Sequence, residues 1–169
     1  MPSETTPGGI GLPQGRLSGR TAFAQAVRDA LQAAASQGWG ELILCDGNFA
    51  DWPLGERAVV EALQAWSRRG RRFVMLAADY GAVRLQHPRF VSWRQTWDHI
   101  IECRLARDVN PNEYPSVLWS PEWVLQRIDV EHDVMICDSA PARRVELRQL
   151  LDECQRNSSP GFPASVLGL

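Results

Sequence analysis

Three short runs in this chain, ELILCDG, RFVMLAAD and DVMICD, are almost continuously apolar until an aspartate ends each of them. Runs of this kind are typical of strands that are buried on both faces of a sheet. In other segments the apolar residues return every three or four positions, as on one face of a helix: Phe23, Val27 and Leu31 before the first run, Val59 and Leu63 after it. The alternation predicts an α/β fold, in which a mixed, largely parallel sheet has helices on both faces.

The predicted order of elements is helix, strand, helix, strand, helix, four strands and a final helix. We expect a helix to begin near Ser18, because the apolar spacing that follows is helical. We expect two more to begin at Pro88 and near Ser139, where Pro88 and Pro141 suit the first turn. SVLWS and WVLQRID, residues 116–120 and 123–129, predict a hairpin.

The domain organisation follows from composition. Residues 1–17 are rich in Gly and Pro and lack apolar periodicity, which predicts a flexible leader. Residues 18–157 form a single predicted α/β domain, and residues 158–169 form a loose tail.

The stretch HPRFVSWRQTWDHIIECR, residues 87–104, concentrates aromatic and basic side chains. Phe90, Trp93 and Trp97 are spaced by three and four residues and so share one helical face, which favours packing over a base-stacking surface. HIIECRLA then alternates, which predicts a strand with His99 on the same face as Ile101 and Cys103.

All 18 basic residues are arginines, since the chain contains no lysine. Mechanisms that need a lysine, such as Schiff-base chemistry or a P-loop, are therefore excluded. The net charge of -2 argues against a general polyanion-binding surface, so nucleic acid is not the expected partner. The basic segment RRGRR, residues 68–72, leaves nucleic-acid binding through an Arg-rich surface as an alternative.

The four cysteines, Cys45, Cys103, Cys137 and Cys154, form no CxxC motif and no Cys/His ligand spacing. We therefore expect reduced thiols, a cytoplasmic protein and no zinc. No apolar run approaches the length of a membrane span, and no secretory signal is recognised. No cofactor is expected.

Asp46, Asp79 and Asp138 each end a predicted strand. Ligands gather at the carboxyl ends of strands in open α/β sheets, so three carboxylates there would suit a metal-dependent phosphoester hydrolase. Aspartates also begin loops and cap helices, and this second interpretation is favoured. We expect no metal, and the hydrolase remains the alternative.

The histidines carry weaker signals. His99 is more typical of a hydrogen-bonded core residue than of a ligand. His87, before Pro88, either caps a helix or lines a cleft. His132 is expected to be exposed. No serine lies in a nucleophile-elbow setting, which excludes a hydrolytic triad.

Three stretches, LCDGNFADWPL, HPRFVSWRQTWDHIIECR and DVMICDSAPARRVELRQLLDEC, resemble an uncharacterised proteobacterial phospholipase D-like domain, found alone or behind an acetyltransferase domain. The resemblance covers residues 20–156. It implies one half-unit of the phospholipase D-like fold, a homodimer that supplies the second half, and an acetyltransferase-type partner.

Active members of that family carry a His-x-Lys-x4-Asp motif on the hairpin. The corresponding stretch here, EYPSVLWSPEWVLQR, contains neither His nor Lys. The resemblance therefore implies a non-catalytic member that works as a binding or interaction module, and it leaves enzymatic activity doubtful. We expect the ligand at the strand ends, near a set of polar and aromatic residues: Asp46, Asn48, Asp51, Trp52, His87, Arg89 and His99.

Overall fold

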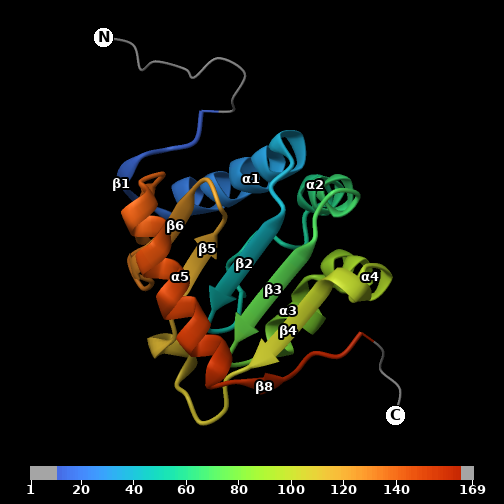
Figure 1. Ribbon diagram of the computed structural model, residues 1–169. Coiled ribbons are helices and arrows are strands. Elements are labelled where there is room, and N and C mark those ends of the chain that lie inside the picture. Colours follow the sequence, from blue (N-terminus) through green and yellow to red (C-terminus); the bar gives the residue numbers. More distant parts are fainter. Residues whose placement is uncertain (1–10, 165–169) are drawn as a thin grey trace.

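The computed structural model describes residues 11–164, which form one eight-stranded sheet with helices on both faces (Figure 1). The sheet order is β1-β7-β6-β5-β2-β3-β4-β8. The strands are β1 (Gly15–Ser18), β2 (Glu41–Asp46), β3 (Arg72–Ala77), β4 (Ile101–Leu105), β5 (Ser116–Trp119), β6 (Val124–Asp129), β7 (Val134–Asp138) and β8 (Ser159–Pro160). The helices are α1 (Arg20–Gln37), α2 (Arg57–Ser67), α3 (Gly81–Gln86), α4 (Pro88–Thr96) and α5 (Pro141–Arg156), with 3-10 turns η1 (Asp98–Ile100) and η2 (Pro111–Glu113).

The sheet is mixed, but the prediction that it is largely parallel is wrong. β2 pairs in parallel with β3, and β3 with β4, whereas the other five pairings are antiparallel. Parallel neighbours need a long crossover connection. The consecutive strands β5, β6 and β7 are joined by short turns instead, so they can only run back and forth.

Helices cover both faces of the sheet, as the apolar runs predicted. Along β2, Leu42 and Leu44 face the larger core beneath α1, α2 and α4. Ile43 and Cys45 face the smaller core beneath α5. Figure 1 shows α5 crossing one face of the sheet, while α1 and α2 lie on the other side. A strand with helices on both sides must be apolar at every position, and this explains the uninterrupted run.

Both predicted ends of the domain need correction. Residues 15–17 of the expected leader belong to β1, which pairs with β7 along the sheet edge. Residues 159–160 of the expected tail form β8 on β4, and Phe162 is buried beyond it. These two segments are short and contain few apolar residues, so they show no periodic pattern in the sequence. In the structure they pair with the open edges of the sheet. Residues 1–10 of the predicted leader and 165–169 of the predicted tail lie outside the described residues.

The aromatic stretch forms α4, with Phe90 and Trp93 buried and Trp97 half-buried against the same core. The predicted strand begins at Ile101 rather than His99, because Asp98–Ile100 turn as η1. The alternation holds from Ile101 onward. The short helix α3 carried too few residues to show a period and was not predicted.

Candidate functional site

The carboxyl end of β2 is organised by the side chain of Asp46. Its Oδ2 accepts hydrogen bonds from the backbone amides of Asn48 (3.2 Å) and Phe49 (2.8 Å), which turns the chain away from the sheet. Asn48 extends the turn, because its Oδ1 accepts from the amide of Ala50 at 3.0 Å. An aspartate fits here because its carboxylate replaces the strand neighbours that these amides have lost.

Arg127 of β6 binds the other oxygen of Asp46. Its Nη2 donates to Asp46 Oδ1 at 2.9 Å and to Asp51 Oδ1 at 3.1 Å. Its Nη1 donates to Asp51 Oδ2 at 2.5 Å and to Asp133 Oδ1 at 3.0 Å. Its Nε donates to Ser116 Oγ at 2.9 Å. All five N–H groups of the guanidinium are therefore engaged.

This network holds more negative than positive charge. The side chain of Arg127 is 0% exposed, and its guanidinium lies 3.9 Å from the ring centre of Phe23. It pairs with three carboxylates, which leaves two negative charges in excess. The carboxylates raise the pKa of Arg127 against the opposing effect of burial, which is the largest single influence on it. The arginine is thus held as a buried cation that presents no free donor.

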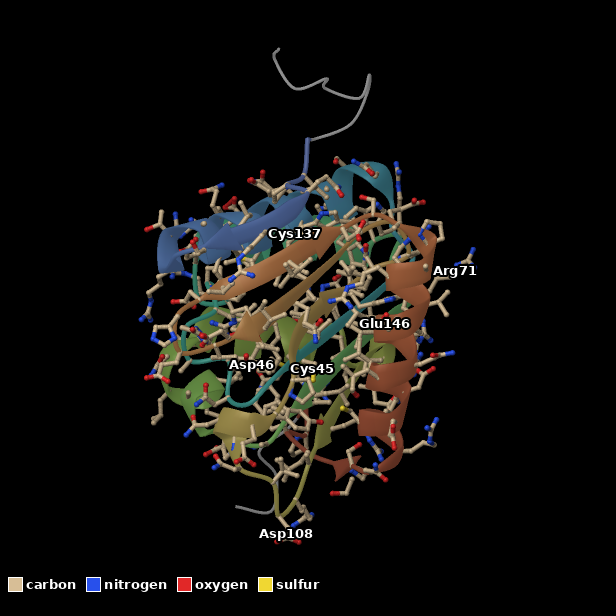
Figure 2. The ribbon with its side chains drawn as sticks, turned by 90° about the vertical axis from the view of Figure 1, so that its left-hand side faces the viewer. Cys45, Asp46, Arg71, Asp108, Cys137 and Glu146 are labelled. Atoms are coloured by element: carbon tan, nitrogen blue, oxygen red, sulfur yellow. The ribbon has the colours of Figure 1, made fainter. Side chains whose placement is uncertain are left out.

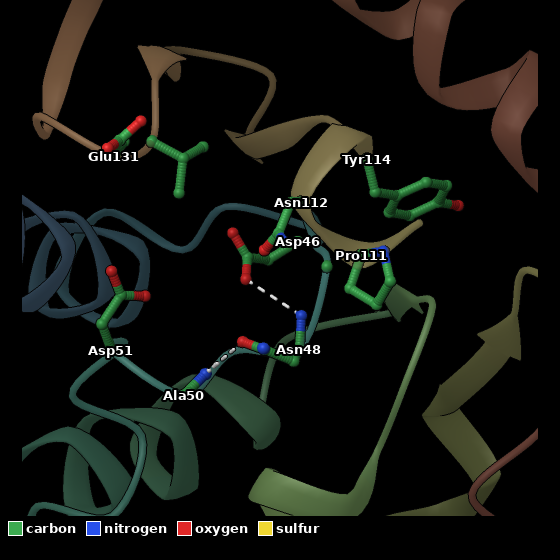
Figure 3. Close-up of a pocket in the computed structure, with 10 residues that line it drawn as sticks. Asp46, Asn48, Ala50, Asp51, Pro111, Asn112, Tyr114 and Glu131 are labelled. Carbon is green, nitrogen blue, oxygen red and sulfur yellow. Dashed lines mark hydrogen bonds between the residues drawn. The ribbon is translucent and has the colours of Figure 1, made fainter. Parts of the chain in front are cut away.

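A cavity of about 530 Å³ opens beside this network (Figure 3). Asp46, Asn48 and Asp51 form one side of it, after β2. Pro111, Asn112 and Tyr114 reach it from the segment around η2, and Val130 and Glu131 from the turn between β6 and β7. The lining is therefore acidic and amide-rich.

Gly47 sets the close approach of two of these segments. A Cβ atom there would lie 2.0 Å from the carbonyl oxygen of Pro111. Only glycine lets the loop after β2 and the η2 segment meet, so this residue defines the cavity wall.

The structure brings together three of the seven predicted site residues. Asp46, Asn48 and Asp51 line the cavity. Trp52 is buried in the core against the rings of Phe23 and Phe49.

The two ends of α4 do not reach the cavity. His87 is buried, with Nε2 at 2.9 Å from the carbonyl oxygen of Phe49, so it supports the loop after β2 from behind. Arg89 donates to the carbonyl oxygen of Gly55 at the surface. His99 is exposed and packs against Trp97, which corrects its predicted place on the inward face of a strand.

The three strand-end aspartates of the hydrolase alternative do not meet. β7 runs opposite to β2, so Asp138 pairs with Val124 beside the hairpin turn, at the far end of the sheet from Asp46. Figure 2 shows Cys137 and Asp46 apart along the sheet. Asp79 is exposed and accepts a hydrogen bond from the amide of Gly81, the first residue of α3, and Asp138 likewise accepts one from the amide of Ala140, directly before α5.

Within residues 11–164, no group of three or more His, Cys, Asp or Glu side chains is arranged to hold a metal. Asp46 already accepts two amides and one guanidinium N–H, which leaves its oxygens little capacity for a cation.

Several residues at the site were missed from the sequence. Arg127, Asp133, Ser116, Asn112 and Glu131 come from β5, β6, η2 and the turn after β6. One signal existed for Arg127, which follows Val124 and Leu125 in the same strand. A charged residue in a buried strand needs partners. Nothing in the sequence identifies which carboxylates those are.

The turn of the hairpin assigned by resemblance to the family's catalytic motif lies at the opposite end of β2 from the cavity, whereas the outer ends of its two strands reach the network around Asp46. Trp119 and Val124 flank its turn and align with Ile43, near the start of β2. Ser120 closes the turn: its Oγ donates to the carbonyl oxygen of Trp123 at 2.6 Å and accepts the amide of Trp123 at 2.9 Å.

No protein-family model matches the chain, and no curated protein matches it. Solved structures do. TrmBL2, an archaeal chromatin protein described as showing a novel mode of DNA binding, matches with a TM-score of 0.67 at 12% identity. The match covers 92% of this chain and 56% of TrmBL2, so this chain spans little more than half of that protein.

NucT from Helicobacter pylori matches with a TM-score of 0.53 at 7% identity. That match covers 86% of this chain and 97% of NucT. At such identities the likeness concerns the fold alone. In the part of the chain that the structure describes, no helix is long and apolar enough to cross a membrane.

Proposed function

We propose that this chain is a non-catalytic binding domain with a phospholipase D-like fold, and that its ligand occupies the cavity at the carboxyl end of β2. The family's nucleophile and its lysine have no counterpart in the hairpin, and lysine is absent from the whole chain. The aspartates of the rival hydrolase lie at two ends of the sheet. A binding role requires neither the missing catalytic residues nor a meeting of the three aspartates.

The cavity itself carries the proposal. Its volume of about 530 Å³ suits a small ligand or a side chain of a partner. The nearest cation, Arg127, is fully buried and already has five hydrogen bonds, whereas Glu131 at the rim is exposed. The electrostatic potential inside the cavity is therefore negative. It favours a ligand with an ammonium or guanidinium group and disfavours a phosphate.

Titration with agmatine, spermidine and inorganic phosphate, followed by NMR or calorimetry, tests this assignment. We expect the two cations to bind and phosphate not to bind. Glu131→Gln should weaken cation binding several-fold. Glu122→Gln, a matched loss of an exposed carboxylate at the opposite end of the sheet, should leave it unchanged. Equal weakening by both variants, or binding of phosphate alone, would refute the assignment.

The non-catalytic part has its own test. A generic phosphodiester such as bis(p-nitrophenyl) phosphate should not be turned over by the chain, with or without Mg²⁺ or Mn²⁺. Turnover that requires a divalent cation, and that Asp46→Asn abolishes, would favour the hydrolase instead.

Nucleic-acid binding is a second candidate, favoured by a basic cluster of Arg68, Arg69 and Arg71. All three side chains are exposed, and no ion pair of theirs is found among residues 11–164. They lie after α2, where the amide of Arg71 bonds the carbonyl oxygen of Gly40 before β2, at the end of the sheet opposite the cavity.

Duplex DNA binding measured against salt tests this second candidate. If the cluster neutralises phosphates, affinity should fall steeply with salt, and changing all three arginines to glutamine should flatten that slope. A slope unchanged in the triple variant would exclude the cluster.

The family resemblance also supports a homodimer and an acetyltransferase-type partner as proposals. Light scattering of the full chain at micromolar concentration tests the first, for which a mass of two chains is expected and a mass of one chain would count against it. Co-purification with an acetyltransferase from the source cells tests the second.

A further inference from the structure

A second polar cluster lies on the other face of the sheet, beneath α5. It consists of Cys45 on β2, Tyr114 before β5 and Cys154 near the end of α5. Cys45 is fully buried, Tyr114 is nearly so, and Cys154 is half-buried at the rim of the same core. The two cysteines do not line the cavity, whereas Tyr114 belongs both to this cluster and to the cavity wall, and Cys45 directly precedes Asp46 (Figure 2).

Cys45 is a buried member of the smaller core and Cys154 packs against that core, and each thiol influences the pKa of the other. Cys45 Sγ also approaches the carbonyl oxygen of Pro115 at 3.4 Å, as a donor. The hydroxyl of Tyr114 is buried and has no hydrogen-bond partner among the described residues. A buried hydroxyl in this condition is uncommon, and here it belongs to the same core cluster as Cys45, against which Cys154 packs.

The two thiols differ in acidity. The Cys45 thiol lowers the pKa of Cys154 to about 7, against the opposing effect of burial. Burial raises the pKa of Cys45 well above its usual range. Cys103 and Cys137 are buried in the larger core, and burial raises their pKa values to about 11 and about 12. Cys154 is thus the most nucleophilic thiol of the chain, and it is accessible from one side.

We propose that Cys154 and Cys45 form a peroxide-sensitive thiol pair that closes an internal disulfide between α5 and β2. The Cys154 thiolate attacks one oxygen of hydrogen peroxide, which forms the S–O bond of a sulfenic acid and releases hydroxide as the O–O bond breaks. The Cys45 sulfur then attacks the Cys154 sulfur, the S–O bond breaks, and the leaving oxygen takes the Cys45 proton. Each disulfide consumes one peroxide, and the two thiols are oxidised by two electrons.

The cross-link joins residues that lie far apart in the chain. It would fix α5, which covers its face of the sheet alone in the described residues, to the central strand β2. Closing so long a loop lowers the entropy of the unfolded chain, so the oxidised protein should melt at a higher temperature.

Peroxide treatment of the reduced full chain, followed by peptide mapping, tests the pair. We expect two of the four thiols to be lost, a mass decrease of two hydrogen atoms, and a linked peptide that joins Cys45 to Cys154. The melting temperature should rise by at least about 5 °C and return to its original value with dithiothreitol.

Variants separate this pair from general thiol oxidation. Cys45→Ala should accumulate a Cys154 sulfenic acid that dimedone labels, and Cys154→Ser should form no intramolecular link. Cys103→Ser, a matched change in the other core, should still give the linked peptide. The unmodified chain gives the decisive map even if Cys45→Ala folds poorly. A map without the Cys45–Cys154 link, or a link lost equally in Cys103→Ser, would overturn the proposal.

Discussion

The buried guanidinium of Arg127 donates a hydrogen bond to the carboxylate of Asp46 over 2.9 Å and thereby joins β6 to the end of β2. These residues lie 81 positions apart in the chain. Their contact fixes the loop after β2 and the turn after β6 on two sides of the cavity. The free energy of folding and the shape of the cavity therefore depend on the same ion cluster.

Removing this arginine should be costly. Arg127→Met keeps much of the apolar stem but leaves Asp46, Asp51 and Asp133 without their shared cation. Breaking a buried ion pair on one side typically costs about 3–5 kcal/mol of unfolding free energy. Urea denaturation of the variant and the unmodified chain measures this loss of unfolding free energy.

The control is Arg143→Gln, which breaks a pair with Glu146 whose side chain is 67% exposed. That change should cost at most about 1 kcal/mol. Similar losses in the two variants would show that the cluster around Arg127 stabilises the fold no more than an exposed ion pair does.

Gly47→Ala should damage the cavity wall. The new methyl group would collide with the carbonyl oxygen of Pro111, so backbone on one side must shift. We expect a loss of about 1–3 kcal/mol in stability and weaker binding of cationic probes. Gly40→Ala places its methyl group in open space and should change stability by no more than about 0.5 kcal/mol. Unchanged stability and cavity chemical shifts in Gly47→Ala would contradict this account of the wall.

Phe162→Ala tests whether the segment after β8 belongs to the folded core. Phe162 is 5% exposed, stacks on Tyr80 at 5.0 Å, and its carbonyl oxygen accepts a hydrogen bond from buried Arg94. Truncating a buried phenylalanine costs about 3 kcal/mol or more. Leu85→Ala, at a side chain 86% exposed, should have almost no effect. Equal, small effects in a chemical denaturation series would mean that the segment is an appendage.

The acidity of Cys154 predicts a pH profile for alkylation by iodoacetamide. Only the thiolate reacts, and the pKa of about 7 keeps half of it ionised near neutral pH. The rate at Cys154 should therefore rise between about pH 6 and pH 8 and then level off. Cys45→Ala removes the neighbouring thiol, so the midpoint should move to higher pH. A midpoint near that of an ordinary thiol in both proteins would exclude the interaction.

Local sequence patterns predicted the elements more reliably than their arrangement. Leu42 to Cys45 had to be buried on both faces because every residue there is apolar, and the two cores beneath α5 and α1 confirm it. Pro88, Phe90 and Trp93 likewise predicted α4. β1 and β8 were not predicted from the sequence. A short edge strand gains most of its stability from backbone pairing, which does not depend strongly on the types of its side chains.

The sequence by itself determined the α/β class, the buried strands, the loop-forming role open to Asp46 and the absence of lysine chemistry. Only the tertiary structure decided that β7 runs against β2, which separates Asp138 from Asp46, and that Arg127 reaches Asp46, Asp51 and Asp133 together. The physical reason is range. Apolar periodicity and turn chemistry act within a few residues, whereas strand order and ion pairing are fixed by contacts between segments tens of residues apart.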